Sequence, residues 1–345
     1  MKTVLINKTE IKPLLKQAAQ HWDVYAPLKE SGGDVNFCHL PKTKIGSVLN
    51  RVTLDDSWIP VPPKDVFFPQ LESLFEINKH KIKETIEYSK KLLFGIKACD
   101  FQGILFCDNF FKRNFQDSYY LSRTQDRLLI VKGCLSPPRP NACFCTSTKT
   151  GPFLDQDFDL QLIDIDREYF VQIGSEKGEE FIAKYRRFFR DSSDSDTEKA
   201  EIVKKKAVDS IDLKIDFSKA LKLISEDKGL PEELLKRIAQ RCIYCGGCIY
   251  VCPTCTCFNV FDDIQNETIV RYRNWDTCVF EGFSREASGF NPRAPKWLRA
   301  TRRYEHKLRH DYQTTGKSGC VGCGRCLVSC PVNLGMSKFI QEITE

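Results

Sequence analysis

The sequence predicts an α+β protein in which an N-terminal α/β domain precedes a cysteine-rich C-terminal domain. We expect the first domain over residues 1–190, a charged linker over 191–216 and the second domain over 217–345. Three observations support this division: buried-strand patterns in the first half, a strongly polar run near the middle, and two regular cysteine strings in the last third. A chain of 345 residues is long enough for two such domains.

Strand patterns define the N-terminal domain. Residues 92–96 and 128–131 are short, continuous apolar runs, which are typical of strands buried on both faces of a sheet. Residues 160–165 and 169–173 follow as two further strand-like segments. We therefore expect an α/β sheet in this part of the chain.

Helical patterns surround these strands. The segments with helical periodicity are 10–21, with Pro13 in its first turn, 70–78, 79–91, 179–190, 217–224 and 231–240. The acidic run 191–198 and the lysines at 204–206 lie between the fourth and fifth of these segments. So polar a stretch can bury little apolar surface, and we interpret it as a flexible linker between the domains.

Two cysteine strings organise the C-terminal domain. The first is Cys242, Cys245, Cys248 and Cys252 before Pro253, and the second is Cys320, Cys323, Cys326 and Cys330 before Pro331. Each string has the pattern C-x2-C-x2-C-x3-C-P of two-cluster ferredoxins, in which three cysteines hold one 4Fe-4S cluster and the fourth crosses to the other. The pattern predicts a ferredoxin-like dicluster domain.

The crossing rule also predicts the ligands of each cluster. The first cluster is assigned to Cys242, Cys245, Cys248 and Cys330, and the second to Cys320, Cys323, Cys326 and Cys252. Structural zinc is the alternative. A zinc ribbon, however, uses two C-x2-C pairs for one tetrahedral ion, whereas here a string of four cysteines occurs twice. Iron bound through these eight cysteines is the favoured interpretation.

Four further cysteines are predicted to meet at one edge of the N-terminal sheet. Cys99 and Cys134 each follow one of the two buried apolar runs, and Cys143 and Cys145 come shortly afterwards. In open α/β sheets ligands bind beyond the carboxyl ends of the strands. Our hypothesis is a third 4Fe-4S cluster with an irregular ligand pattern. Zinc and buried structural thiols are the alternatives.

A long insertion separates the two cysteine strings, which a small two-cluster ferredoxin joins by a short connection. The insertion contains Cys255, Cys257 and Cys278, and the chain also has Cys38 and Cys107 outside all the predicted ligand sets. Packing is the default role for each of these five thiols. The three in the insertion lie close to the first string and could also substitute as cluster ligands.

Composition bounds the setting of the protein. The start of the chain has too short an apolar run for a signal peptide, and no apolar stretch approaches the ~20 residues of a membrane span. We therefore expect a cytoplasmic, soluble protein whose 17 cysteines are reduced. A net charge of +6 with interleaved acidic residues does not indicate nucleic-acid binding. No dinucleotide or nucleoside triphosphate fingerprint occurs.

One basic stretch, residues 299–310, precedes the second cysteine string. It can be a solvated helix face. It can also be a surface that docks an electron-transfer partner or that offsets the negative charge of cluster thiolates. Arg325, which lies inside the second string, is a candidate for raising the potential of a cluster.

Several blocks of the chain resemble one known family. They are residues 241–258 (RCIYCGGCIYVCPTCTCF), 275–278, 289–293 and the second cysteine string, together with 97–100 and 143–147. These blocks are similar to the iron-sulfur beta subunit of soluble NAD(P)-linked nickel-iron hydrogenases, also called sulfhydrogenases. One iron-sulfur component of anaerobic sulfite reductase is similar over the same stretches. The resemblance implies an electron-carrying subunit of a cytoplasmic complex, in which other subunits hold a flavin for NAD(P)H and a nickel-iron or sirohaem site.

The expected function is therefore a relay of single electrons between the catalytic metal of one partner and the flavin/NAD(P)-binding subunit. No general acid, base or nucleophile is required in this chain, so we expect a non-catalytic subunit of an oxidoreductase complex. The sequence leaves hydrogen and sulfite open as the terminal chemistry. Two other hypotheses remain: catalysis at the irregular cysteine site, and a redox-sensing regulator, against which the lack of a helix-turn-helix pattern counts.

Overall fold

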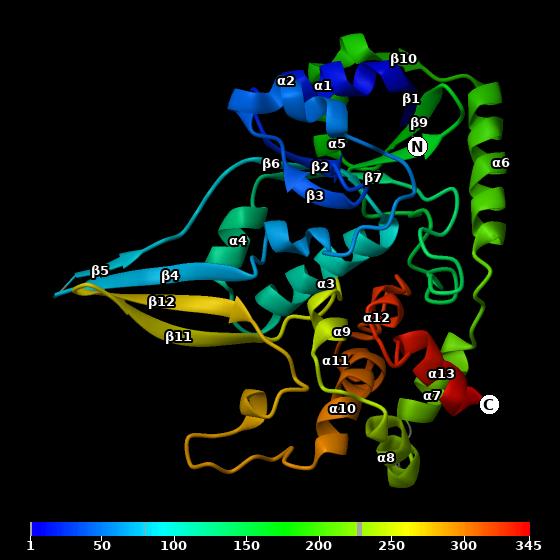
Figure 1. Ribbon diagram of the computed structural model, residues 1–345. Helices are drawn as coiled ribbons and strands as arrows, with labels where there is room; N and C mark the ends of the chain where they lie inside the picture. Colours follow the sequence, from blue (N-terminus) through cyan, green and yellow to red (C-terminus); the bar gives the residue numbers. More distant parts are fainter. Residues whose placement is uncertain (1, 80, 226–229) are drawn as a thin grey trace.

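The computed structural model describes residues 2–79, 81–225 and 230–345 (Figure 1). Positions 1, 80 and 226–229 lie outside the described residues, and position 80 falls within the helix predicted over 79–91. The fold is a mixed α/β arrangement, as the sequence predicts, with an eight-stranded sheet, a four-stranded sheet and helices around them.

The large sheet has the strand order β10–β1–β9–β8–β7–β6–β2–β3 (Figure 1). Its strands are β1 (Lys2–Asn7), β2 (Asp23–Lys29), β3 (Val35–His39), β6 (Lys91–Ile96), β7 (Arg127–Lys132), β8 (Leu160–Asp164), β9 (Glu168–Ile173) and β10 (Phe189–Asp191). Strands β2, β6, β7 and β8 are parallel to one another, and the remaining pairs are antiparallel. All four strands predicted from apolar runs are confirmed.

Helices cover both faces of this sheet. They are α1 (Ile11–Ala18), α2 (Ile45–Val48), α3 (Ala98–Arg113), α4 (Ser118–Thr124) and α5 (Glu176–Lys184), with 3-10 turns at Lys8–Glu10, Lys42–Lys44, Leu49–Arg51, Pro63–Val66 and Arg186–Phe188. Leu92 of β6 packs in one core with α1 and α5, whereas Leu93 packs in the other with Phe101 of α3. Because neighbouring side chains of a strand point to opposite faces, a continuous apolar run is what this double burial requires.

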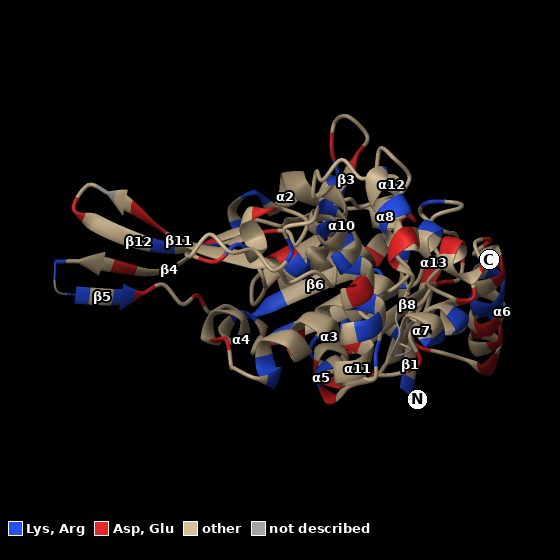
Figure 2. Cartoon of the chain, turned by 90° about the horizontal axis from the view of Figure 1, so that it is seen from below, with Lys and Arg blue, Asp and Glu red and all other residues tan. Residues whose placement is uncertain are grey.

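The small sheet extends away from the body of the molecule (Figures 1 and 2). It has the order β11–β12–β4–β5, with β4 (Leu71–Asn78), β5 (Lys81–Glu84), β11 (Phe258–Gln265) and β12 (Thr268–Trp275). Its inner pair joins β4 of the N-terminal half to β12 of the insertion between the cysteine strings. We call it the projecting sheet.

The helices predicted over 70–78 and 79–91 are wrong, because these residues form β4, β5 and the start of β6. Leu71, Ser73, Phe75 and Ile77 alternate with more polar residues at the period of a strand, which competes with the helical pattern. The partner that decides between the two lies far along the chain, where Thr268–Trp275 pairs with β4.

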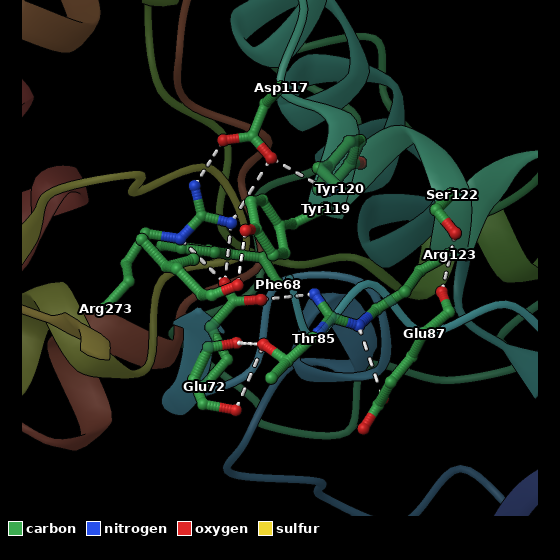
Figure 3. A network of polar contacts seen from close by, with 12 residues as sticks. Phe68, Glu72, Thr85, Glu87, Asp117, Tyr119, Tyr120, Ser122, Arg123 and Arg273 are labelled. Atoms are coloured by element: carbon green, nitrogen blue, oxygen red, sulfur yellow. Dashed lines mark hydrogen bonds and ion pairs between the residues drawn. The ribbon is translucent and has the colours of Figure 1, made fainter. Parts of the chain in front are cut away.

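A buried ionic network anchors the base of the projecting sheet (Figure 3). Arg273 of β12 donates from Nε to Glu72 of β4 at 2.7 Å and also pairs with Asp117, the N-cap of α4. Arg123 of α4 pairs with the same Glu72 carboxylate. The side chains of both arginines and of Glu72 are only 3–4% exposed, so each charge depends on its partners.

The predicted flexible linker is largely a helix, α6 (Asp194–Ser210). It begins with a capping box, in which the Asp196 amide donates to Ser193 Oγ at 3.3 Å and the Ser193 amide donates to Asp196 at 3.1 Å. Ala200 packs against Ile163 of the large sheet, and the other side of the helix is exposed. The polar composition of 191–216 therefore reflects a one-sided surface helix and not a flexible chain.

The last third of the chain is helical around the cysteine strings. Its helices are α7 (Phe217–Ser225), α8 (Glu232–Gln240), α9 (Gly247–Tyr250), α10 (Lys296–Glu305), α11 (Asp311–Thr315), α12 (Arg325–Val328) and α13 (Met336–Thr344), with a 3-10 turn at Gly282–Ser284 and a π-helical turn at His306–His310. The helices predicted at 217–224 and 231–240 are confirmed. In their core Tyr304 stacks on Phe339 at 3.9 Å. No helix in the described part of the chain has the length and apolar character to span a membrane.

Candidate metal centres

The two cysteine strings fold in the same way. In each, the fourth residue after the first cysteine is a glycine in the left-handed region, with φ of 74° at Gly246 and 73° at Gly324. Each glycine is the N-cap of a one-turn helix that carries the third cysteine, α9 in the first string and α12 in the second. Glycine adopts this conformation at no steric cost, which explains its place in both strings.

The first predicted ligand set lines a single cavity. Cys242, Cys245, Cys248 and Cys330 surround a space of about 480 Å³, together with apolar side chains that include Val279. Cys330 comes from the second string and crosses to the three cysteines of the first. The structure thus brings together the four cysteines that the crossing rule groups.

The second predicted ligand set also gathers in one place. Burial raises the pKa of the Cys320 thiol to about 12, and Cys326 and Cys252 lie close enough to raise it further. Burial likewise raises the pKa of Cys323, which is near the same two thiols. Because a thiol must lose its proton to bind iron, metal binding at such buried cysteines releases protons.

The third predicted ligand set lines a second cavity of the same size. Cys99 begins α3 just after β6, and Cys134 follows β7, so both lie at the carboxyl edge of the parallel strands. With Cys143 and Cys145 they surround a space of about 480 Å³. Burial raises the pKa of Cys143 to about 11 and that of Cys145 to about 12. All four cysteines therefore face one enclosed space, as the sheet-edge argument predicts.

The third set lies directly against the second cysteine string. The Cys143 thiol donates to the Cys323 carbonyl at 3.8 Å, and the Phe144 amide donates to the Gly322 carbonyl at 2.8 Å. A β-carbon on Gly322 would come within 2.7 Å of the Cys145 backbone. Only glycine permits so close an approach of the two loops.

These cysteines surround volumes and do not converge on points. Among the described residues, no group of three or more histidine, cysteine, aspartate and glutamate side chains is arranged to hold one metal ion. Tetrahedral zinc needs its sulfur ligands at about 2.3 Å from a single centre. A cubane instead places four thiolates around a larger body, which fits cavities of this size.

Comparison with protein families gives a match to the 4Fe-4S dicluster domain over residues 241–334. This chain carries a 4Fe-4S dicluster domain. A curated relative, the protein named Sulfhydrogenase 2 subunit beta of Pyrococcus furiosus, is 28% identical over 298 residues, which are 86% of this chain and 87% of that protein. The resemblance to sulfhydrogenase beta subunits that the sequence predicts is confirmed by this similarity.

Buried cations lie beside the cysteines of the dicluster domain. Arg299, Arg303 and Lys307 are spaced four residues apart along α10 and the following turn, and all three are at most 5% exposed. The Arg303 guanidinium hydrogen bonds to the Cys248 sulfur, and Lys307 donates to Thr254 Oγ1 at 2.6 Å. These buried positions exclude a fully solvated face and favour the interpretation that the basic stretch offsets thiolate charge.

The charge of the cysteines holds these cations in their charged form. Although burial would lower the pKa of Lys307, the nearby sulfurs of Cys252 and Cys255 hold it well above its usual value. Neither Arg303 nor Lys307 forms an ion pair with a described carboxylate, so the sulfurs are their main counter-charge. Sequence reasoning did not single out these two residues, although their spacing of four within a basic helix is the signal of one shared face.

Arg325 occupies a buried position between the second and third ligand sets. It forms a two-pronged ion pair with Asp100 of α3, at 2.6 and 2.9 Å, and donates to the Ile59 carbonyl at 2.9 Å. Burial opposes its charge, but Asp100 and Cys323 hold its pKa well above the usual value. The guanidinium therefore joins the dicluster domain to α3 while keeping a positive charge near the cysteines of both sets.

Backbone amides donate to several of the cysteine sulfurs. The Tyr244 amide lies 3.4 Å from Cys242 Sγ, and the Leu334 amide lies 3.2 Å from Cys330 Sγ. Cys326 Sγ accepts from the Met336 amide at 3.3 Å. Hydrogen bonds to cluster sulfurs stabilise the more negative, reduced state and so raise the reduction potential.

The five remaining cysteines separate into two groups. Cys38 packs beside the large sheet, and the buried Cys107 thiol donates to the Pro253 carbonyl at 3.5 Å, which agrees with packing roles. Cys255, Cys257 and Cys278 instead line a smaller cavity of about 280 Å³ next to Arg303 and Lys307.

Proposed function

We propose that this chain carries single electrons between a flavin subunit that handles NAD(P)H and the catalytic metal subunit of a cytoplasmic hydrogenase complex. The electrons pass through three 4Fe-4S clusters. Their ligands are Cys242, Cys245, Cys248 and Cys330 for the first, Cys320, Cys323, Cys326 and Cys252 for the second, and Cys99, Cys134, Cys143 and Cys145 for the third. The dicluster domain supports the electron-transfer role, and the name of the Pyrococcus relative supports a hydrogenase-type complex.

The observation that carries this proposal is the direct contact between successive ligand sets. The first and second sets exchange cysteines, because Cys330 lies with the first string and Cys252 with the second. The second and third sets touch through the Cys143 thiol and the Cys323 carbonyl. Three one-electron carriers in this order form a continuous path from the dicluster domain to the carboxyl edge of the large sheet.

The two ends of the path differ in exposure, which suits a relay between two partners. Cys245 is exposed, and the neighbouring Ile243 is 58% exposed, so one redox partner can approach the first ligand set at the surface. Cys134, Cys143 and Cys145 are buried beneath the Trp58 loop at the other end. Buried residues there exclude water from the third site, and burial is one of the factors that tune a cluster's potential.

Anaerobic purification of the native complex through this chain tests the proposal. Three cubanes require about twelve iron atoms per chain, whereas about eight would eliminate the third cluster. Among the partners we expect nickel and a hydrogenase large subunit. Sirohaem instead would assign the same relay to sulfite reduction. A chain that purifies without partners would contradict the proposal and favour the regulator or the stand-alone catalyst.

A ligand substitution tests the path itself. Cys245→Ser removes an exposed ligand of the first cluster, so we expect loss of about four iron atoms and of electron flow between the partner subunits. Cys38→Ser is the matched control, because Cys38 lies outside every ligand set and should leave both unchanged. Full physiological turnover in Cys245→Ser would show that the path does not run through this site.

A further inference from the structure

The cavity lined by Cys255, Cys257 and Cys278 differs from the three predicted cluster sites. In it the Cys257 and Cys278 thiols are close enough to share a hydrogen bond, and the Cys257 sulfur also accepts from the Cys278 amide. Ligands of a cubane are held apart by the cluster, whereas these two sulfurs touch. The cavity of about 280 Å³ is also much smaller than the 480 Å³ of the first and third sites.

The pair lies next to both ligand sets of the dicluster domain. Cys278 is near enough to Cys248 of the first set to influence its charge, and Cys257 has the same relation to Cys255, which hydrogen bonds to Cys252 of the second set. The two contacting thiols therefore lie between two one-electron carriers. A dithiol exchanges two electrons when it forms a disulfide, so two adjacent single-electron carriers match its requirement.

The surroundings favour the thiolate that such chemistry needs. Buried Arg303 and Lys307 line the cavity, and His306 lies beside them with its Nε2 3.2 Å from Asp311 Oδ1. The hydrogen bond from Cys278 lowers the pKa of Cys257 to about 6, and the same bond raises the pKa of Cys278. One member of the pair is thus a thiolate while the other keeps its proton, which is the arrangement of a reactive dithiol.

We propose that Cys257 and Cys278 form a redox-active dithiol–disulfide couple that exchanges electrons with the two clusters of the dicluster domain. The proposal rests on the proposed function, because the clusters are its electron acceptors. On oxidation one S–S bond forms and the S–H bond of Cys278 breaks. Each sulfur gives up one electron, one to each of two oxidised cubanes, and the single proton leaves by way of His306 or water. Reduction reverses every step.

The couple would let a relay of one-electron carriers hold an electron pair. A flavin that accepts a hydride delivers two electrons, while each cubane takes one. A dithiol beside two cubanes can store both until a partner accepts them. Cys255 has no part in this step, because it contacts the predicted ligand Cys252.

Mass spectrometry of the full chain, purified anaerobically with its clusters, tests the proposal. The chain is equilibrated in mixtures of reduced and oxidised dithiothreitol, acid-quenched, alkylated and digested. Under oxidising mixtures we expect the peptides of Cys257 and Cys278 to be joined by a disulfide, and under reducing mixtures both cysteines to carry the alkyl label. The linked fraction should rise from near zero to near completion while the iron content stays constant.

Three variants make the test specific. Cys257→Ser and Cys278→Ser should each abolish the linked peptide and keep the iron content of the unmodified chain. Cys107→Ser is the matched control, since it removes a buried thiol near Cys252 that takes no part in the pair. It should keep both the linked peptide and the iron.

Two outcomes would overturn the inference. One is a wild-type chain with full iron and no linked peptide in any mixture, a result that does not depend on how the variants fold. The other is loss of about four iron atoms in Cys257→Ser or Cys278→Ser, which would make these residues cluster ligands. A wild-type chain with less iron than two cubanes require would instead contradict the proposed function, so the two failures are distinguishable.

Discussion

At the scale of single residues, the closest backbone approach between the two halves of the molecule depends on Gly322. Its φ is 62°, and a β-carbon there would lie 2.7 Å from backbone atoms of Cys145. Gly322→Ala must therefore separate the second cysteine string from the loop of the third site. We expect the variant to lose the iron of the third cluster, about four of about twelve atoms per chain, as measured by metal analysis after anaerobic purification.

Gly316 provides the matched control for this substitution. Its φ is 71°, and a β-carbon there would meet nothing within 4 Å. Gly316→Ala therefore carries the backbone cost of a left-handed alanine, about 1–2 kcal/mol, without the steric clash. It should keep all of its iron. Equal iron in the two variants would mean that the third cysteine set does not depend on this contact.

At the scale of elements, the projecting sheet depends on the buried charges at its base. Arg273→Met removes the cation shared by Glu72 and Asp117 and leaves Asp117 without this partner. Breaking a buried ion pair costs about 3–5 kcal/mol, so we expect the amides of β4 and β12 to exchange at least about a hundredfold faster. Hydrogen exchange followed by mass spectrometry measures this. Arg271→Met, which removes an exposed partner of Asp262 in the same strand, should change little, and equal effects would contradict the anchoring role.

The same elements show what the sequence can and cannot predict. Strands β6 and β7 are predictable because double burial writes a continuous apolar run into the local sequence. Strand β4 is not, because its identity depends on pairing with β12, which lies almost 200 residues later. Helix α6 is missed for a different reason: a surface helix that buries only a few small residues, such as Ala200, has the composition of a linker.

The candidate sites follow the same logic. Ligand spacing within a cysteine string is local, and the sheet-edge rule brings Cys99 and Cys134 together, so the ligand sets can be grouped from sequence alone. The burial of Arg303 and Lys307 depends on how α10 packs against both strings, which no local pattern contains. The contact between Cys257 and Cys278 is also tertiary, since the projecting sheet intervenes between them in the chain.

At the scale of the whole molecule, the two halves should respond differently to iron removal. The large sheet has its own apolar cores, whereas the dicluster domain buries Arg303 and Lys307 among cysteine sulfurs without a described carboxylate partner. An oxidant and an iron chelator should therefore expose the amides of α10 and α13 to hydrogen exchange while β6 and β7 stay protected. This result is expected because cluster binding and the folding of its ligands are coupled.

The sign of a double substitution then separates charge compensation from ordinary packing. In the iron-loaded chain Arg303→Met with Lys307→Met removes cations that face thiolate charge, so the variant should be less stable to heat than the unmodified chain. In the iron-free chain the sulfurs are largely protonated thiols, because burial raises the pKa of Cys248 and Cys320. The same variant should then be the more stable of the two, since an uncompensated buried cation costs several kcal/mol. Thermal unfolding of both chains with and without iron measures the reversal, and a destabilisation of equal size in both states would mean that the two cations act through packing alone.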